Sequence, residues 1–237
     1  MPRLALSLCC LLVATGSNAA VNLLDPSSWV DWLSSRQPSQ DLEKWKRPDF
    51  WNSECPRYKL EKKCDEYEIR TYEGGKWAVT KVNETKYELA YVKATGRLMK
   101  YFKGGNDKGE YMDITTPTLA RLKPTQETES TERDYSFSYW LPEEYQRHTP
   151  QPTDASVKLR KYGKATVYVR VFAGFATEST ILDNTRALHE SLKDDDQDYS
   201  EKELFVAVYD PPQKLLSRHN EIHVPVCDRK QLQPASA

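Results

Sequence analysis

Cationic and apolar side chains alternate regularly between residues 89 and 102. At about 100° per residue, Lys93, Arg97 and Lys100 form a narrow cationic stripe on a helix. The stripe borders an apolar arc made of Leu89, Tyr91, Val92, Gly96, Leu98, Met99 and Phe102. Cations attract carboxylates, and an apolar surface favours the flat face of an organic molecule. The spacing therefore suits one wall of a site for a planar, apolar, anionic ligand.

The same pattern has a purely structural explanation. An amphipathic helix that packs on a sheet and leaves a solvated basic edge shows the same periodicity. Gly104 and Gly105 follow the pattern and indicate the end of the helix, because glycine enters the left-handed cap at little cost. The sequence alone leaves both interpretations open.

Other groups that could bind metals or catalyse reactions give weaker signals. His219 and His223 have the i, i+4 spacing of metal ligands on a helix, but residues 221–226 look extended. The acidic run 194–198 lacks the glycine and the glutamate that a calcium loop needs at its sixth and twelfth positions. The sequence also lacks the G-x-S-x-G, H-E-x-x-H and Walker motifs. We therefore expect no enzymatic activity.

The first residues have the features of a secretory signal peptide. Arg3 precedes the apolar run 4–13, and Ser17 and Ala19 are the small residues of a cut after position 19. The apolar run is too short to span the ~30 Å of a bilayer core. We therefore expect a secreted, extracellular protein from which residues 1–19 are removed.

Secretion affects how the cysteines and one asparagine are interpreted. Cys55, Cys64 and Cys227 remain after the leader, so at most one internal disulfide can form. Cys55 and Cys64 are closest in sequence, but the two ends of one extended strand lie beyond the ~7 Å that a disulfide can bridge. Pairing of Cys227 with either of them would tie the last strand to the first. Asn83 begins the glycosylation sequon Asn-Glu-Thr.

Length and composition fit one domain with additional segments. The chain has 237 residues, a net charge of -1 and 14 tyrosines. The absence of a basic surplus argues against a general nucleic-acid binder. We divide the chain into the signal peptide 1–19, a Trp- and Pro-rich extension 20–54, a domain 55–227 and a C-terminal tail 228–237.

Periodicity predicts a β-rich domain with two helices. A second helix is predicted over 178–193 with Ile181, Leu182, Leu188 and Leu192 inward, and a turn or two of helix over 29–33. The segment 125–133 reads as a polar loop. Strands are predicted at 58–62, 67–72, 77–82, 118–122, 135–141, 157–162, 165–172, 204–209 and 221–226.

An internal repeat relates the two halves of the domain. Residues 69–74 match 169–174, and residues 58–60 match 157–159 with one residue of slippage. Two such halves joined by short loops predict one pseudo-symmetric α+β domain. Its sheet is expected to curl into a distorted antiparallel β-barrel flanked by two α-helices.

Several segments, in the same order, resemble the SOUL heme-binding protein family. They are residues 66–78, 99–117, 137–146, 167–175 and 209–222. The similarity covers about Cys55 to Val226, and the leader makes the chain similar to a secreted branch of the family. The resemblance implies a distorted β-barrel and non-catalytic binding of heme or a related tetrapyrrole in a shallow apolar pocket with a basic rim.

The resemblance also implies which residues hold the ligand. In the family the first helix and neighbouring strands form the pocket, and basic residues are proposed to hold the propionates. By position these are Lys100 and Lys214. A further family arginine falls at Val92, and Arg97 or Lys93 can substitute for it from one turn away. The implied heme-binding set is Leu89, Val92, Lys93, Gly96, Arg97, Met99, Lys100 and Lys214.

The chain departs from the family at the axial ligand of the iron. Some members carry a histidine in the motif Y-E-I-R-H-Y, where this chain has Thr71, which cannot replace an imidazole. His223, where relatives usually have tryptophan, is the remaining candidate for an axial ligand. We therefore expect heme to bind weakly or reversibly, and other porphyrins to be tolerated.

Two other functions remain in competition. A secreted protein-interaction or signalling module that has lost heme coordination is favoured by Thr71, by the Trp-rich extension and by the sequon. A small-molecule hydrolase would need Glu68 or Glu110 as a base, but no second catalytic group is identifiable.

Overall fold

The computed structural model describes residues 53–123 and 134–227. The signal peptide, the helical turn predicted at 29–33, the loop predicted at 125–133 and the C-terminal tail lie outside the described residues.

The strands and the second predicted helix have bounds that agree with the predicted ranges to within two residues, whereas the short 3-10 helix at Glu143–Tyr145 was not predicted. The strands are β1 (Tyr58–Lys63), β2 (Glu68–Tyr72), β3 (Gly75–Asn83), β4 (Thr118–Leu122), β5 (Asp134–Trp140), β6 (Val157–Tyr162), β7 (Ala165–Phe172), β8 (Leu204–Val208) and β9 (Asn220–Pro225). The helices are α2 (Tyr87–Phe102), the short 3-10 helix η2 (Glu143–Tyr145) and α3 (Glu178–Asp194).

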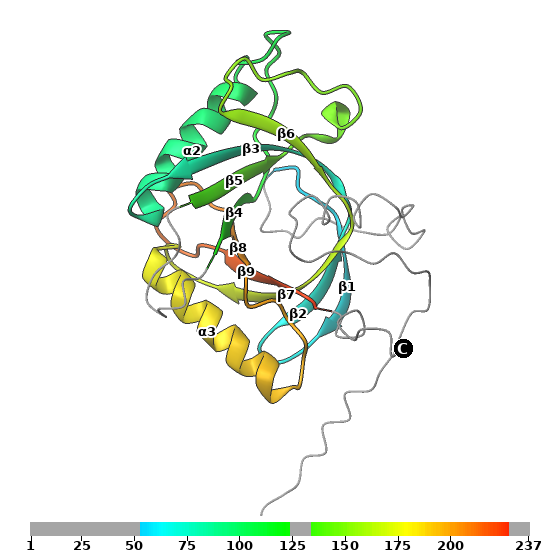
Figure 1. Cartoon of the computed structure of the whole chain (residues 1–237), viewed down its shortest axis with the longest axis vertical. Helices are drawn as coiled ribbons and strands as arrows, with labels where there is room; N and C mark the ends of the chain where they lie inside the picture. Colours follow the sequence, from blue (N-terminus) through cyan, green and yellow to red (C-terminus); the bar gives the residue numbers. More distant parts are fainter. Residues whose placement is uncertain (1–52, 124–133, 228–237) are drawn as a thin grey trace, which may run out of the picture.

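The strands form one sheet in the order β1-β2-β7-β9-β8-β4-β5-β3-β6. All its neighbouring strands are antiparallel. The sheet curls into a half-barrel, and both helices lie on the same side of it (Figure 1). The predicted class, an α+β distorted barrel flanked by two helices, is confirmed. The strands β1 and β6 are the two edges of the sheet.

The strand order shows the pseudo-symmetry directly. Reading inward from the two ends, β2-β7-β9-β8 mirrors β6-β3-β5-β4, and β1 is an addition to one half. Helix α2 follows β3, and helix α3 follows β7 in the same way. The repeat is therefore present, but the matched strands differ from those expected. The sequence comparison aligned β2 with β7, whereas these strands pair with each other and β7 corresponds to β3. Short alternating motifs look alike in any half-buried strand, so they misplace the register of a repeat.

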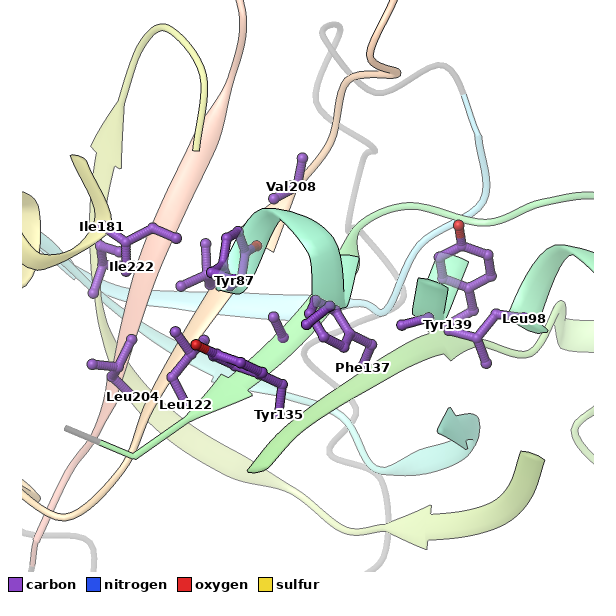
Figure 2. Packing of buried hydrophobic residues seen from close by; sticks show 14 of the residues in the cluster. Tyr87, Leu98, Leu122, Tyr135, Phe137, Tyr139, Ile181, Leu204, Val208 and Ile222 are labelled. Atoms are coloured by element: carbon purple, nitrogen blue, oxygen red, sulfur yellow. The ribbon is translucent and has the colours of Figure 1, made fainter. Parts of the chain in front are cut away.

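Helix α2 packs on the sheet through a narrow set of residues. Its buried residues are Tyr87, Ala90, Ala94, Leu98, Tyr101 and Phe102. The two alanines let the helix axis approach the sheet closely. Tyr87 packs against two aromatic rings of β5: its ring centre is 5.8 Å from that of Phe137 and 6.1 Å from that of Tyr135. Figure 2 shows these rings among the aliphatic side chains of β4, β8, β9 and α3.

The structure divides the apolar arc predicted on this helix. Leu98 and Phe102 are buried in the core, whereas Leu89 and Val92 are exposed to solvent. An arc that covers half of a helix is wider than the strip that the sheet can cover, so one edge remains outside. The helix ends where expected: Phe102 is its last residue, and Gly104 adopts a left-handed φ of 88°.

Helix α3 begins at a capping box and packs against the other half of the sheet. Thr177 Oγ1 accepts a hydrogen bond from the Thr180 amide at 3.2 Å, and the Thr177 amide donates to Thr180 Oγ1 at 2.9 Å. Ile181, Leu188 and Leu192 are buried as predicted, and Leu182 is half-buried. One continuous hydrophobic core therefore joins α2, α3 and the helix-facing side of the sheet.

The three cysteines expected to remain after secretion form no disulfide in the structure. Cys55 is buried beside Ala207 and Tyr209, on the other face of the sheet from the main core. Cys64 and Cys227 both influence the pKa of Tyr168, which burial raises to about 12. The described chain therefore shows none of the disulfide pairings considered from the sequence.

Candidate functional site

The exposed side of α2 carries the apolar residues that the packing leaves uncovered. Leu89 is 54% exposed and Val92 is 69% exposed. A Cβ atom added to Gly96 would meet no other atom within 4 Å, so the helix surface is shallow and open there. Met99, one turn further along, is half-buried. The predicted apolar wall is therefore accessible from solvent.

The predicted cations border this strip on the side of β3 and β6. Lys93 Nζ lies 2.8 Å from Glu84 Oε1. Arg97 donates a hydrogen bond to the carbonyl oxygen of Lys81 on β3 at 3.0 Å. Lys100 is exposed, and its charge helps to lower the pKa of Asp154, which lies just before β6; hydrogen bonds from Ser156 are the larger cause. Because Lys93 and Arg97 have partners, Lys100 is the most available of the three cations.

The connection between β8 and β9 lies between the beginnings of α2 and α3 (Figure 1). Arg218 holds this connection together, because its guanidinium donates to the carbonyl oxygens of Pro211 and Lys214 at 2.7 Å each and to that of Asp210 at 3.0 Å. Lys214 Nζ lies 2.7 Å from Asp210 Oδ1. Burial acts to raise the pKa of Asp210, but hydrogen bonds from Lys214 and the His219 amide outweigh it and lower the pKa.

Two contacts and one charge interaction link the β8–β9 connection, the start of α3 and helix α2. The Arg218 guanidinium lies 4.6 Å from the ring centre of Phe175, just before α3. The charge of Arg218 also acts on the hydroxyl of Tyr91 on α2, whose pKa burial raises. The amide of Glu178, the first residue of α3, donates to Glu88 Oε1 on α2 at 3.0 Å.

Exposed apolar side chains gather around this junction. Phe175 is 46% exposed, Leu215 69% and Leu216 81%. We call these three residues, together with Leu89, Val92 and Gly96, the helix–loop surface. Lys93, Arg97 and Lys100 lie on the same helix as its α2 residues, and Lys214 lies in the same connection as Leu215 and Leu216. Five of the eight exposed large apolar side chains of the described residues lie on the helix–loop surface. Such a concentration is typical of a binding surface.

Sequence reasoning missed the loop half of this surface. Phe175, Leu215, Leu216 and Arg218 are far from α2 in sequence, and no periodicity relates them to it. The adjacent pair Leu215-Leu216 in a polar, Pro-rich connection was the available signal. Lys100 lies on α2 and Lys214 lies in the β8–β9 connection, so the two cations come from different elements.

His223 lies in a different environment from the helix–loop surface. It is buried on the face of the sheet turned away from the helices, and its Nε2 donates to Glu221 Oε2 at 2.8 Å. His219 Nε2 and Arg70 donate to Glu221 Oε1 at 2.8 and 2.9 Å. Burial acts to raise the pKa of Glu221, but these hydrogen bonds and the charge of Arg70 outweigh it and hold the pKa well below its usual value. The structure does not bring His223 together with the predicted residues on α2.

Thr71, at the position of the family histidine, is also remote from solvent. It is 5% exposed, and its hydroxyl lies 3.0 Å from that of Thr166 on the neighbouring strand. Among the described residues, no group of three or more His, Cys, Asp or Glu side chains could hold a metal ion.

Comparison with known proteins identifies the family. The family model described as SOUL heme-binding protein matches residues 53–225. The chain belongs to the SOUL heme-binding protein family. Mouse heme-binding protein 1 is 33% identical over 156 residues, which cover 66% of this chain and 82% of the mouse protein. Human heme-binding protein 2 is 31% identical over 156 residues, which cover 66% of this chain and 76% of the human protein.

Solved structures share the fold of this SOUL-family chain. The crystal structure of the EcmrR C-terminal domain superimposes with a TM-score of 0.53 at 12% identity, covering 69% of this chain and 98% of that domain. At this identity the similarity shows the architecture alone. No described helix of this SOUL-family protein is long and apolar enough to cross a membrane.

The helix–loop surface fits the organic part of a heme. Its leucines, valine and phenylalanine match the ring, and the lysines of the same elements match the propionates. No histidine of the described residues is available there as a ligand for the iron. The chain has four histidines. His219 and His223 hydrogen-bond Glu221, His189 stacks on Tyr199 with the rings 4.6 Å apart, and His148 lines a separate depression.

Proposed function

We propose that this chain binds heme or a related tetrapyrrole reversibly and without catalysis on the helix–loop surface. Membership of the SOUL family supports the ligand class. The observation that supports the location is the exposure of Leu89 and Val92 on α2 and of Leu215 and Leu216 in the β8–β9 connection, whose Arg218 contacts Phe175 at the start of α3. The ring would lie over Gly96, where the helix surface is shallow.

The physical chemistry of this surface predicts modest affinity. Covering roughly 300 Å² of apolar area contributes about 7 kcal/mol. Each exposed ion pair with a propionate adds about 0.2–1 kcal/mol. Association itself costs at least about 4 kcal/mol. Without a histidine ligand for the iron, the balance is at most about 5 kcal/mol, which corresponds to a dissociation constant of roughly 0.2 mM or weaker, with little discrimination between iron and metal-free porphyrins.

The test is a hemin titration followed by the Soret band and by quenching of tryptophan fluorescence. We expect saturable binding, and a clear loss in Leu216→Asp, because a carboxylate in the apolar surface repels both the ring and the propionates. Leu60→Asp is the matched control, since Leu60 is an exposed leucine on β1, an edge of the sheet. Lys100→Ala combined with Lys214→Ala should weaken binding if both lysines hold propionates.

Two results would remove this proposal. One is the absence of any saturable change up to about 1 mM hemin, several times the expected dissociation constant. The other is equal binding by Leu216→Asp and Leu60→Asp, which would place the ligand elsewhere. If only the double lysine variant binds normally, the apolar surface remains the site and the two propionate contacts are withdrawn.

The proposal includes secretion and glycosylation. It rests on the leader 1–19 and on the sequon, whose Asn83 is the exposed last residue of β3. Expression in a mammalian secretory cell should release a chain that begins at Ala20 and loses mass on treatment with an N-glycosidase, with Asn83→Gln as the control. Retention in the cell with an intact N-terminus would contradict secretion and leave ligand binding untouched.

A second candidate function is a secreted protein-interaction or signalling module. The exposure of Leu215 and Leu216 favours it as well, because a protein partner can cover the same apolar surface. A pull-down from the extracellular medium with wild type and with Leu216→Asp, with and without hemin, separates the two. Partner capture that hemin does not affect, in a chain that fails the titration, would favour the module.

A further inference from the structure

An open depression lies at the end of α2 away from the β8–β9 connection. It has a volume of about 520 Å³. Its lining comes from the start of β3, the α2–β4 connection, the segment after η2 and the edge strand β6. Four stretches that are distant in sequence therefore build one concave surface. None of the exposed large apolar side chains of the described residues lines it.

The lining of this basic depression is cationic. Lys76, Lys108, Arg147, Arg160 and Lys161 line it together with His148, and no described carboxylate does. The whole chain has a net charge of -1, so positive charge is more concentrated in this depression than in the chain as a whole. Lys76 Nζ donates to the carbonyl oxygen of Arg147 at 3.3 Å and to Thr149 Oγ1 at 3.2 Å, which positions this cation without neutralising it.

Carboxylates occur only near the rim of the depression. Glu110 lies 4.0 Å from Lys108 Nζ, which is a long contact between exposed groups. Asp107 accepts a hydrogen bond from the amide of Gln151 at 2.7 Å. The cations of β6 and of the segment after η2 are Arg147, Arg160 and Lys161, and among the described residues no ion pair is recorded for them.

Protection of the sheet edge does not account for this arrangement. Charged side chains on an edge strand prevent pairing with other molecules, and β6 is an edge. Edge protection needs only charged side chains on the edge strand itself, and their sign does not matter. Here Lys76, Lys108 and Arg147 converge on the same concavity from outside β6. Convergence of one sign of charge from several segments is the arrangement that attracts an anionic ligand.

We propose that the basic depression binds a sulfated polysaccharide chain. An open surface with dispersed cations suits a linear polyanion, which can pair with several cations in succession. The lining contains no tyrosine, phenylalanine or tryptophan on which a nucleic-acid base could stack. It also has no exposed apolar side chain to insert into a membrane surface. The choice among polyanions rests on the proposed secretion, because sulfated polysaccharides are the polyanions of the extracellular space.

The test is binding of the purified full-length secreted chain to a heparin dodecasaccharide, measured by calorimetry at several salt concentrations. Arg160→Gln with Lys161→Gln should weaken binding about tenfold or more and reduce its salt dependence, because fewer counterions are released. Lys62→Gln with Lys63→Gln is the matched control. It makes the same change of charge on β1, the opposite edge of the sheet, and should bind as wild type does. Desulfated heparin should not bind.

Three results would overturn the proposal. They are no binding of the dodecasaccharide by wild type, equal losses in the two double variants, or equally tight binding of desulfated heparin. Binding of polyglutamate, RNA or phosphatidylserine vesicles as tight as that of heparin would also exclude a sulfated polysaccharide as the specific ligand. Hemin titration of Arg160→Gln with Lys161→Gln provides an independent readout, so failure here is distinguishable from failure of the helix–loop surface.

Discussion

Glu221 is the centre of a buried cluster of polar side chains. It is 0% exposed, and both of its oxygens are occupied. Arg70 and His219 donate to Oε1, while His223 and the Tyr209 hydroxyl donate to Oε2 at 2.8 Å. Residues 219, 221 and 223 alternate along β9 and its approach, so their side chains point to the same face of the sheet. Arg70 comes from β2, so the cluster ties strands that are not neighbours in the sheet.

Replacing this carboxylate should destabilise the fold strongly. In Glu221→Gln, the amide presents donors to groups that are themselves donors, and Arg70 loses its buried partner. We expect a loss of about 3–5 kcal/mol, the usual cost of breaking a buried ion pair. Urea denaturation followed by tryptophan fluorescence measures it. Glu61→Gln is the control, because that exposed pair with Lys59 is worth at most about 1 kcal/mol. Equal stabilities of the two variants would show that the cluster is dispensable.

The difference between wild type and Glu221→Gln should also depend on pH. The pKa of Glu221 is well below its usual value in the folded chain, because the hydrogen bonds from His219 and His223 and the charge of Arg70 outweigh the effect of burial. The unfolded chain therefore takes up a proton first as the pH falls, near pH 4.3. The stabilisation by Glu221 is fully present above that pH and is lost as the pH falls towards the folded pKa. The two denaturation curves should thus converge in acid.

At the scale of elements, α2 has a double role. Its small residues Ala90 and Ala94 and its aromatic residues face the sheet, whereas Leu89, Val92 and Gly96 remain outside. A glycine inside a helix weakens it, since alanine is favoured by about 0.8–1 kcal/mol. No packing contact explains Gly96, because nothing lies within 4 Å of its absent Cβ. The space that it leaves on the helix–loop surface is consistent with a planar ligand there.

Substitutions at Gly96 separate helix stability from ligand binding. Gly96→Ala and Gly96→Leu should both stabilise the chain against urea by up to about 1 kcal/mol, because both residues favour helix and neither meets an atom. Gly96→Leu should weaken hemin binding about tenfold, an amount worth about 1.4 kcal/mol, and Gly96→Ala should do so much less. Hemin affinity that Gly96→Leu leaves unchanged would mean that the ring does not lie over this part of α2.

At the scale of the whole molecule, the two halves meet at equivalent turns. Gly74, between β2 and β3, faces Gly163, between β6 and β7, and a Cβ on Gly74 would lie 2.6 Å from the Gly163 Cα. Beside them, a Cβ on Gly75 would lie 1.9 Å from Cη2 of Trp140, which is buried against Trp77 with the rings 5.2 Å apart. The turns at which the two halves meet therefore leave no room for a side chain at Gly74 or Gly75.

Gly75→Ala tests the close contact between Gly75 and Trp140. The added methyl group must displace Trp140, and we expect a loss of about 1–3 kcal/mol in urea denaturation, as for other overpacked cores. Trp140→Phe removes the ring atoms that clash, so the double variant should be more stable than the sum of the single losses predicts. Strict additivity of the two losses would show that the steric conflict is relieved elsewhere.

The amino-acid sequence by itself determined the secondary structure, the fold class and the family. Strands and helices follow from local periodicity, and the ends of β6 and β7 matched the expected residues. The segments that resemble the family are recognised from their residues and from their order along the chain. The cations on α2 were also identifiable, since helical spacing relates Lys93, Arg97 and Lys100 without knowledge of the rest.

Only the tertiary structure decided which side of α2 is covered, which strands are equivalent and which distant residues meet. Arg70 and Glu221 are 151 residues apart, and their contact depends on the pairing of β2 and β9 with β7. Helix α2 packs on β3, β5 and β6, and the β8–β9 connection leaves strands further along the same sheet, so their relative position depends on the strand order. Periodicity describes a single element, whereas burial is a property of pairs of elements.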